Sequence, residues 1–160
     1  MTTVPPARSF AEDKRAEIRA SAAAIGINEA YISRLVECFY VRIRADASLG
    51  PIFENRIGDQ WDPHLARMKA FWASVALNAG AYSGRPVPVH QRLDGVTRRH
   101  FAHWLELFRE TLTETAPSAE AVEYFMSRAE RIAASLQMAM FDRFPGANRE
   151  PPVLARGKTT

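Results

Sequence analysis

The sequence predicts an all-α fold, and three observations lead to this prediction. Apolar residues recur every three to four positions in each long segment, and no segment alternates apolar and polar residues as a half-buried strand does. Capping residues and prolines stand where the periodic segments begin and end. The chain has 160 residues, of which 47% are hydrophobic and 24% charged, and this is the size and composition of one globular domain.

The two ends of the chain carry no clear apolar periodicity. We expect residues 1–24 to form an N-terminal extension, partly flexible and with room for a short helix, and residues 145–160 to form a flexible tail. Pro145-Gly146 ends the preceding helix, and Pro151-Pro152 excludes a following one. The folded domain is therefore predicted to span residues 25–144.

The first predicted helix lies between a cap at Asn28 and a break at Gly50-Pro51. Its apolar residues follow the spacing i, i+3, i+4, i+7, i+8, i+11 of a single buried face. These residues are Ile32, Leu35, Val36, Phe39, Tyr40 and Ile43. Cys38 precedes Phe39 in this helix, and we expect it to be a small buried apolar residue.

The second predicted helix covers residues 61–80 and has the clearest start. Asp62 precedes Pro63, so a capping carboxylate stands before a residue whose missing N–H does no harm at the first helical position. Gly80 and Gly84 close the helix. Its apolar face carries Leu65, Met68, Trp72, Val75 and Ala79.

Two further helices follow an irregular connection. Residues 81–97 contain closely spaced prolines and glycines, so only a short turn near residues 88–93 is expected there. The third helix starts after a cap at Thr97, and the fourth and longest runs from Pro117-Ser118 to near Pro145. The expected buried residues are Phe101, Trp104, Leu105, Phe108 and Leu112 in the third helix, and Val122, Phe125, Met126, Ala129, Ile132, Ala133, Leu136 and Met140 in the fourth.

Composition and charge exclude several classes of protein. A single cysteine excludes an internal disulfide framework, and no run approaches the roughly 20 apolar residues of a membrane span. The first residues lack the basic start and apolar run of a secretory signal. The net charge of +3 comes from 21 basic and 18 acidic residues spread along the chain, without the basic stripe of a nucleic-acid-binding protein. We therefore expect a soluble, cytoplasmic protein that binds neither nucleic acid nor membrane.

The motifs of common enzymes are also missing. The chain has no G-x-S-x-G elbow, no G-x-G-x-x-G turn and no phosphate-binding loop. His100 and His103 are three residues apart and could share a metal ion on one helix face. No cysteine or second pair of histidines is spaced to complete such a site. We therefore expect two surface or half-buried polar groups.

His64 and His90 stand among apolar and aromatic residues. Met68 lies one turn after His64, and Phe71 and Trp72 lie one turn further. His90 lies on the irregular connection and can approach from another direction. Two imidazoles that face each other across an apolar slot suit a haem iron, one as the permanent ligand and the other beside the ligand-binding position. From these residues alone, the commoner alternative is two core histidines with satisfied hydrogen bonds.

A set of short motifs occurs in order between Tyr31 and Phe144. They are Phe39-Tyr40, Leu49-Gly50-Pro51-Ile52-Phe53, Trp61-Asp62-Pro63-His64-Leu65-Ala66-Arg67-Met68, Phe71-Trp72, Tyr82-Ser83-Gly84-Arg85-Pro86, His90-Gln91-Arg92-Leu93 and His100-Phe101-Ala102-His103-Trp104-Leu105-Glu106-Leu107-Phe108. Each motif alone is weak, but in this order and at this spacing they resemble the truncated haemoglobins, specifically group III.

The resemblance implies a truncated globin, in which helices packed two over two enclose a b-type haem. It makes His90 the proximal ligand of the iron. It places Phe53 against the haem face and Trp72 deeper along the helix that carries the distal histidine. For each nearby arginine the alternative to a propionate contact is solvated surface charge. The candidates for the propionates are Arg92, Arg98 and Arg99.

On the ligand side, the resemblance implies that Tyr40, His64, Met68 and Trp104 line the distal pocket. Tyr40 lies on the apolar face of its helix, so its hydroxyl is expected to be buried and to need a partner, which dioxygen would provide. The indole nitrogen of Trp104 can only donate. The alternative for both is a core aromatic residue that donates to a backbone carbonyl. His103 stands where many relatives are expected to carry arginine, and the sequence assigns it no role.

The expected function is reversible binding of dioxygen, and of carbon monoxide, nitric oxide or cyanide-like ligands. In one interpretation the protein stores, delivers or senses the ligand. In another it is an enzyme that turns over nitric oxide or peroxide, as a dioxygenase or peroxidase, with an unknown reductase as partner. In a third the resemblance is accidental and the chain is a helical module without haem. The sequence leaves open the oligomeric state and whether His64 coordinates the iron in the ligand-free protein.

Overall fold

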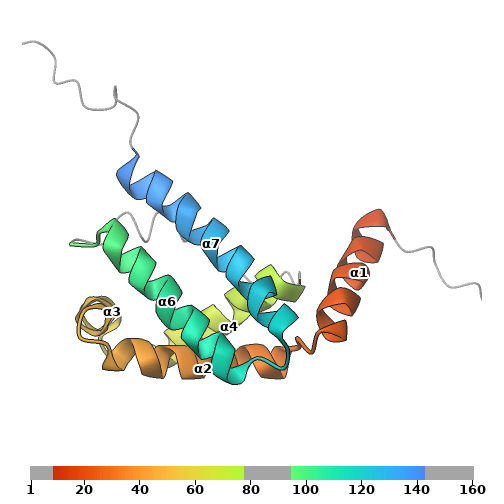
Figure 1. Ribbon diagram of the computed structural model, residues 1–160, viewed down its shortest axis with the longest axis horizontal. Helices are drawn as coiled ribbons and strands as arrows, with labels where there is room; N and C mark the ends of the chain where they lie inside the picture. Colours follow the sequence, from red (N-terminus) through yellow and green to blue (C-terminus); the bar gives the residue numbers. More distant parts are fainter. Residues whose placement is uncertain (1–8, 78–94, 143–160) are drawn as a thin grey trace, which may run out of the picture.

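The helices of the chain pack as two crossing pairs. The structure, a computed structural model, describes residues 9–77 and 95–142. Within these ranges there are helices and no strand. The helices α6 and α7 lie side by side, α2 and α4 cross below and behind them, and α3 lies at one end of α2 (Figure 1). The predicted all-α, two-over-two fold is confirmed. The helices are α1 (Phe10–Ala24), α2 (Glu29–Ala45), α3 (Leu49–Ile57), α4 (Trp61–Leu77), α6 (Arg98–Thr115) and α7 (Ala119–Phe141).

The helix α2 begins and faces the core as predicted. The Oδ1 atom of Asn28 accepts the N–H of Tyr31 at 2.8 Å, and every residue of the predicted apolar face is buried. The expectation for Cys38 was wrong, because its side chain is exposed. One residue corresponds to a rotation of about 100° around a helix, which turns Cys38 away from the face of Phe39. It lies instead on the side of Val41, which is 71% exposed.

The break predicted at Gly50-Pro51 lies earlier, at residues 46–48. The Oδ1 atom of Asp46 accepts the N–H groups of Ser48 at 2.9 Å and of Leu49 at 2.8 Å, and α3 starts there. Gly50-Pro51 therefore lies inside the first turn of a helix that the sequence did not predict. Proline is tolerated in a first turn because the N–H groups there have no partner within the helix.

Position 50 requires glycine for a steric reason. A Cβ atom on Gly50 would stand 2.8 Å from the carbonyl oxygen of Arg44 and 3.3 Å from that of Ile43. Both carbonyls belong to the last turns of α2. The helix α3 can therefore start tightly against the end of α2 only because no side chain intervenes. This corner fixes the direction in which α3 presents Phe53 to the core.

The helix α4 starts at Trp61, two residues before Pro63, the predicted first helical residue. The N–H of His64 donates to the carbonyl oxygen of Gln60 at 3.1 Å, so helical bonding includes the residues before Pro63. Asp62 therefore lies in the first turn and is not the cap, a correction to the prediction. Its carboxylate still stands at the positive end of the helix dipole. The predicted closure at Gly80 and Gly84 lies outside the described residues.

The starts of α6 and α7 agree with the prediction. Thr97 is the N-cap of α6, and its N–H donates to Nδ1 of His100 at 2.9 Å. Ser118 caps α7 by accepting the N–H of Ala121 at 3.1 Å. Most of the irregular connection, including the short turn expected near residues 88–93, lies outside the described residues.

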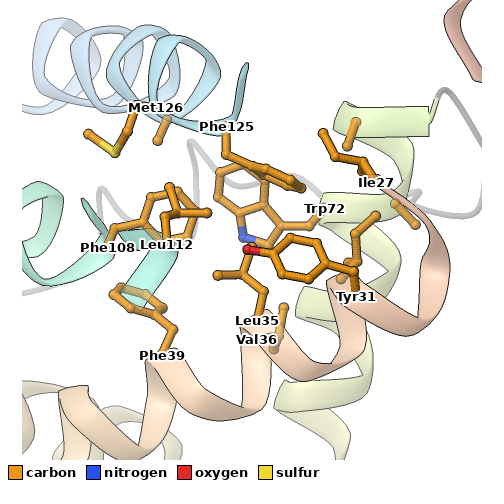
Figure 2. Packing of buried hydrophobic residues seen from close by; sticks show 14 of the residues in the cluster. Ile27, Tyr31, Leu35, Val36, Phe39, Trp72, Phe108, Leu112, Phe125 and Met126 are labelled. Atoms are coloured by element: carbon orange, nitrogen blue, oxygen red, sulfur yellow. The ribbon is translucent and has the colours of Figure 1, made fainter. Parts of the chain in front are cut away.

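Aromatic and aliphatic side chains from α2, α4, α6 and α7 meet in one main core (Figure 2). Phe39, Phe108 and Phe125 are among its largest fully buried side chains, and Trp72 is 3% exposed. A smaller cluster is built on Phe101 with Ala133 and Leu136. Leu105 and Ile132 are half-buried and pack against both clusters.

The helix α1 occupies most of the predicted N-terminal extension and is largely exposed. Ala22 is its one buried residue, and Phe10 is 83% exposed. Arg19 donates through Nε to the carbonyl oxygen of Leu77 at 3.4 Å, which ties α1 to the last residue of α4. None of the described helices is both long enough and apolar enough to cross a membrane.

Candidate functional site

Tyr40 is the centre of an aromatic cage at the junction of α2, α3 and α4. Its ring is 6% exposed and lies 5.0 Å from the ring of His64, at an interplanar angle of 85°. The rings of Phe53 and Trp61 each lie 5.9 Å from that of Tyr40. The fold thus brings together three residues that the sequence assigned to one site, namely Tyr40, Phe53 and His64.

Trp61 is an additional member of this cage. Its ring lies 5.8 Å from that of His64, three residues later in α4. The i, i+3 spacing places the two side chains on neighbouring positions of the helix surface, and this was the one signal for Trp61 in the sequence. Trp61 is 8% exposed, so the cage is closed on this side by a large apolar ring.

An ion pair holds Trp61 in place from outside the cage. The indole Nε1 of Trp61 donates to Oε2 of Glu54 at 3.2 Å, and Arg44 donates through Nε to Oε1 of the same carboxylate at 2.8 Å. The Arg44 guanidinium also lies 4.3 Å from the centroid of the Trp61 ring. The hydrogen bond from Trp61, followed by the one from Arg44, lowers the pKa of the Glu54 carboxyl. The indole N–H of Trp61 is therefore engaged and not directed at a ligand.

The hydroxyl of Tyr40 is in a different situation. Burial raises the pKa of this phenol far above its ordinary value, so it keeps its proton at every physiological pH. No hydrogen bond of this hydroxyl is formed within the described ranges 9–77 and 95–142. The hydroxyl can therefore serve as a hydrogen-bond donor to a small polar ligand beside Tyr40.

Trp104 forms part of a second aromatic group that adjoins the cage. Its ring stacks on Phe108, with centroids 5.3 Å apart and an interplanar angle of 15°, and meets Phe39 edge to face at 5.2 Å. Phe39 directly precedes Tyr40 in α2. Trp104 is half-buried and packs against the main core. The packing fixes the ring plane of Trp104 and leaves it able to donate from Nε1.

Trp72 lies deeper than the other predicted site residues. Its ring stacks on that of Phe108, with centroids 5.0 Å apart, and lies 5.9 Å from that of Phe125. Figure 2 shows Trp72 among the buried core residues. These contacts place Trp72 in the main core beneath the second aromatic group. The structure does not bring its ring into contact with the rings of Tyr40 or His64.

Met68 belongs to a row of half-buried apolar side chains on α4. This row packs against the main core on one side and is partly accessible on the other. The apolar residues Trp104 and Leu105 on α6 have the same partial exposure. Such a surface suits a flat apolar cofactor better than a polar substrate. The residues of the α4 row are Leu65, Met68, Phe71 and Val75.

The remaining predicted site residues are partly outside the described chain. His90 and Arg92 fall between residues 78 and 94, which the structure does not describe. Arg99 is exposed in the first turn of α6. Its neighbour Arg98 pairs with Asp142 at 2.5 Å.

His100 and His103 have separate roles and do not form a shared metal site. His100 accepts the N–H of Thr97 at the start of α6, whereas Nε2 of His103 lies 2.6 Å from Asp46. Within the described ranges there is no group of three or more His, Cys, Asp or Glu residues placed to hold a metal ion. Both histidines are half-buried, which agrees with the expectation of two polar groups at the surface.

The chain is similar to known proteins over most of its length. Residues 23–140 match the family described as Bacterial-like globin. The group 3 truncated hemoglobin ctb of Campylobacter jejuni is 36% identical over 118 residues, which are 72% of this chain and 92% of that protein. A crystal structure of the group III truncated hemoglobin from Campylobacter jejuni matches with a TM-score of 0.68 at 36% identity, again covering 72% of this chain and 92% of that one.

Proposed function

The chain belongs to the bacterial-like globin family, as a truncated haemoglobin of group III, and from this premise we propose that it binds dioxygen reversibly at a haem held by His90. Globins of this family bind haem and small diatomic ligands. The observation that carries the proposal for this chain is the position of Tyr40, which is 6% exposed, lies 5.0 Å from the ring of His64 and keeps its hydroxyl proton.

The residues present fit a haem b. The half-buried apolar row of α4 and the half-buried side chains of Trp104 and Leu105 offer an apolar surface for a porphyrin plane. By the family resemblance, His90 coordinates the iron, Phe53 packs on the haem face, and Arg92, Arg98 and Arg99 are candidates for the propionates. When bound, haem supplies an iron with one open coordination position for a diatomic ligand.

The distal residues retain the ligand. Tyr40 donates its O–H and Trp104 donates its N–H to a ligand that carries partial negative charge, and His64 and Met68 limit the space around it. The low dielectric of the aromatic cage strengthens these hydrogen bonds. Two donors at roughly 1 kcal/mol each slow ligand release by about ten- to a hundredfold. The same pocket accepts carbon monoxide, nitric oxide and cyanide-like ligands.

A second candidate function is enzymatic. A buried donor hydroxyl that retains its ligand for long favours chemistry on that ligand over rapid delivery. In this alternative Tyr40 and Trp104 polarise dioxygen or peroxide, and the protein turns over nitric oxide or peroxide with electrons from a separate reductase. The oxygen dissociation rate separates the two functions. Delivery requires fast release of oxygen, whereas chemistry on the bound ligand requires slow release.

A haemin titration tests the primary proposal. The full chain should take up one haem and show a Soret band, and His90→Ala should lose most of the haem or hold it with an altered axial ligand. His100→Gln is the matched control, because His100 caps α6 through Thr97 and should leave haem binding unchanged. A His90→Ala protein with full haem content and an unchanged ferrous spectrum would show that the iron ligand is another residue.

A further inference from the structure

A histidine and an aspartate join α6 to the corner between α2 and α3. His103 donates through Nε2 to Oδ2 of Asp46 at 2.6 Å, although the two residues are 57 positions apart in the sequence. The other carboxylate oxygen of Asp46 accepts the N–H groups of Ser48 at 2.9 Å and Leu49 at 2.8 Å. One carboxylate therefore holds both the first turn of α3 and a side chain of α6.

Through Asp46, the pair connects α6 with the first turn of α3. Each of these two helices carries an aromatic residue of the proposed distal pocket. The helix α3 presents Phe53, whose ring lies 5.9 Å from that of Tyr40. The helix α6 carries Trp104 directly after His103, and Trp104 meets Phe39 edge to face at 5.2 Å. Because a helix moves as a stiff element, a displacement of His103 moves Trp104 with it.

The charges around His103 favour its imidazolium form. The hydrogen bond to Asp46 raises the pKa of His103 against the opposing effect of burial, and Glu106, whose Oε2 lies 3.4 Å from Nδ1, raises it further. The pKa of the Asp46 carboxyl is lowered, first by the N–H of Leu49 and then by His103. Arg42 on the facing side of α2 is paired with two carboxylates further along α6. An imidazolium can donate from both nitrogens at once, as both carboxylates require.

We propose that the His103–Asp46 pair is a positioning contact that sets how near Trp104 stands to Tyr40, and thereby how long the pocket retains a diatomic ligand. The inference rests on the proposed function, because it takes Trp104 as a donor to the ligand. With a charged imidazole the pair is a charge-assisted hydrogen bond and holds α6 against the corner. When the imidazole loses its proton the attraction weakens, and Trp104 withdraws from the ligand. Arginine, which the family resemblance leads us to expect at this position, would keep its charge at every pH.

Oxygen dissociation rates measured from pH 5 to pH 9 on the haem-loaded full chain test this proposal. The rate of the unsubstituted protein should rise about fivefold as the pH passes through the pKa of His103, which is the effect of weakening roughly one hydrogen bond. His103→Arg should stay slow throughout, and His103→Gln should be fast throughout. The stretching frequency of bound carbon monoxide should shift in parallel, because it reports on hydrogen-bond donors beside the ligand.

Two further variants complete the design. His100→Gln is the matched control on the same helix, since it does not touch Asp46, and its pH profile should equal that of the unsubstituted protein. Asp46→Asn removes the charge from the other partner and should release oxygen quickly, even if His103→Gln fails to fold.

Three outcomes overturn the proposal. The first is a rate that does not depend on pH and is the same for the unsubstituted protein, His103→Arg and His103→Gln. The second is a lower melting temperature for His103→Gln with unchanged rates and an unchanged carbon monoxide band, which would make the pair purely structural. The third is a full chain that takes up no haem at all. This third result also overturns the proposed function, and it is distinguished from the others by the missing Soret band of the unsubstituted protein.

Discussion

The rings of Tyr40 and His64 meet edge to face, with centroids 5.0 Å apart and planes at 85°. They come from α2 and α4, so the contact joins two helices at the point where Phe53 and Trp61 also converge. A phenol and an imidazole with two further aromatic rings form a cage that is apolar apart from its donors. In such surroundings one additional hydrogen bond has a measurable effect on ligand retention.

Tyr40→Phe should speed the release of dioxygen about five- to tenfold, because it removes a donor and keeps the ring that packs on His64. Stopped-flow displacement of dioxygen by carbon monoxide measures this rate. Tyr124→Phe is the control, since the Tyr124 hydroxyl already donates to the carbonyl oxygen of Ala76 at 2.7 Å. It should lower the free energy of unfolding by about 1 kcal/mol and leave the release rate unchanged. Equal rates for Tyr40→Phe and the unsubstituted protein would remove this hydroxyl from ligand retention.

Trp104→Phe should also speed release, by about fivefold. Phenylalanine keeps the stacking on Phe108 and the edge contact with Phe39, and loses only the indole N–H and part of the ring. The double variant with Tyr40→Phe measures the coupling of the two donors. If both donate to one ligand, the combined effect should differ from the product of the single effects. A release rate that Trp104→Phe does not change would place Trp104 in packing alone.

Gly50→Ala should lower the free energy of unfolding by about 1–3 kcal/mol, since its Cβ would meet the Arg44 carbonyl oxygen at 2.8 Å and push α3 from α2. Urea unfolding followed by circular dichroism measures the change. Asn55→Ala, at an exposed position of the same helix, should stay within about 0.5 kcal/mol. If Gly50→Ala is as stable as Asn55→Ala, the contact between α2 and α3 accommodates the added Cβ atom without loss of stability.

The contribution of the His103–Asp46 pair to stability should be largest at about pH 5 to 6. The lowered pKa of Asp46 gives stability that is present above its unfolded value of about 3.9 and lost as the pH falls through the folded pKa. The raised pKa of His103 gives stability that is present below about 6.5 and lost as the pH rises through the folded pKa. The difference in free energy of unfolding between the unsubstituted protein and Asp46→Asn should therefore peak between these limits, at about 1 kcal/mol after screening by solvent.

Urea unfolding at a series of pH values measures that difference. Glu106→Gln is a useful comparison, because its exposed carboxylate lies 3.4 Å from the same imidazole and should contribute less. If this difference in free energy of unfolding does not change between pH 3 and pH 9, the ionisation of His103 and Asp46 does not contribute to the strength of their contact.

Much of the fold followed from local patterns. The spacing of apolar residues predicted the buried face of α2, and the caps at Asn28 and Thr97 and the start of α7 near Pro117-Ser118 were predicted at the right positions. These features depend on a helix and its own first turn, which a short stretch of sequence encodes. The start of α4 at Asp62 and the break at Gly50-Pro51 were misplaced because proline fits several positions of a first turn.

The candidate site could be predicted only in part. The family resemblance indicated Tyr40, Phe53 and His64 as neighbours, and the fold brings their rings together. The proximal residue His90 stays a prediction, since it lies outside the described residues. The hydrogen bond from Trp61 to Glu54 had no signal in the sequence, because the two residues belong to different helices.

The sequence by itself determined that this chain is helical, which face of each helix is apolar, and to which family it is similar. The tertiary structure alone decided which polar groups meet, as His103 meets Asp46 across 57 positions and Arg44 and Trp61 meet at Glu54. The physical reason is that periodicity specifies the face of one helix, whereas the rotation and crossing of two helices are set by packing of the whole core. A polar contact between helices depends on that rotation and crossing, so it exists only once the core has formed.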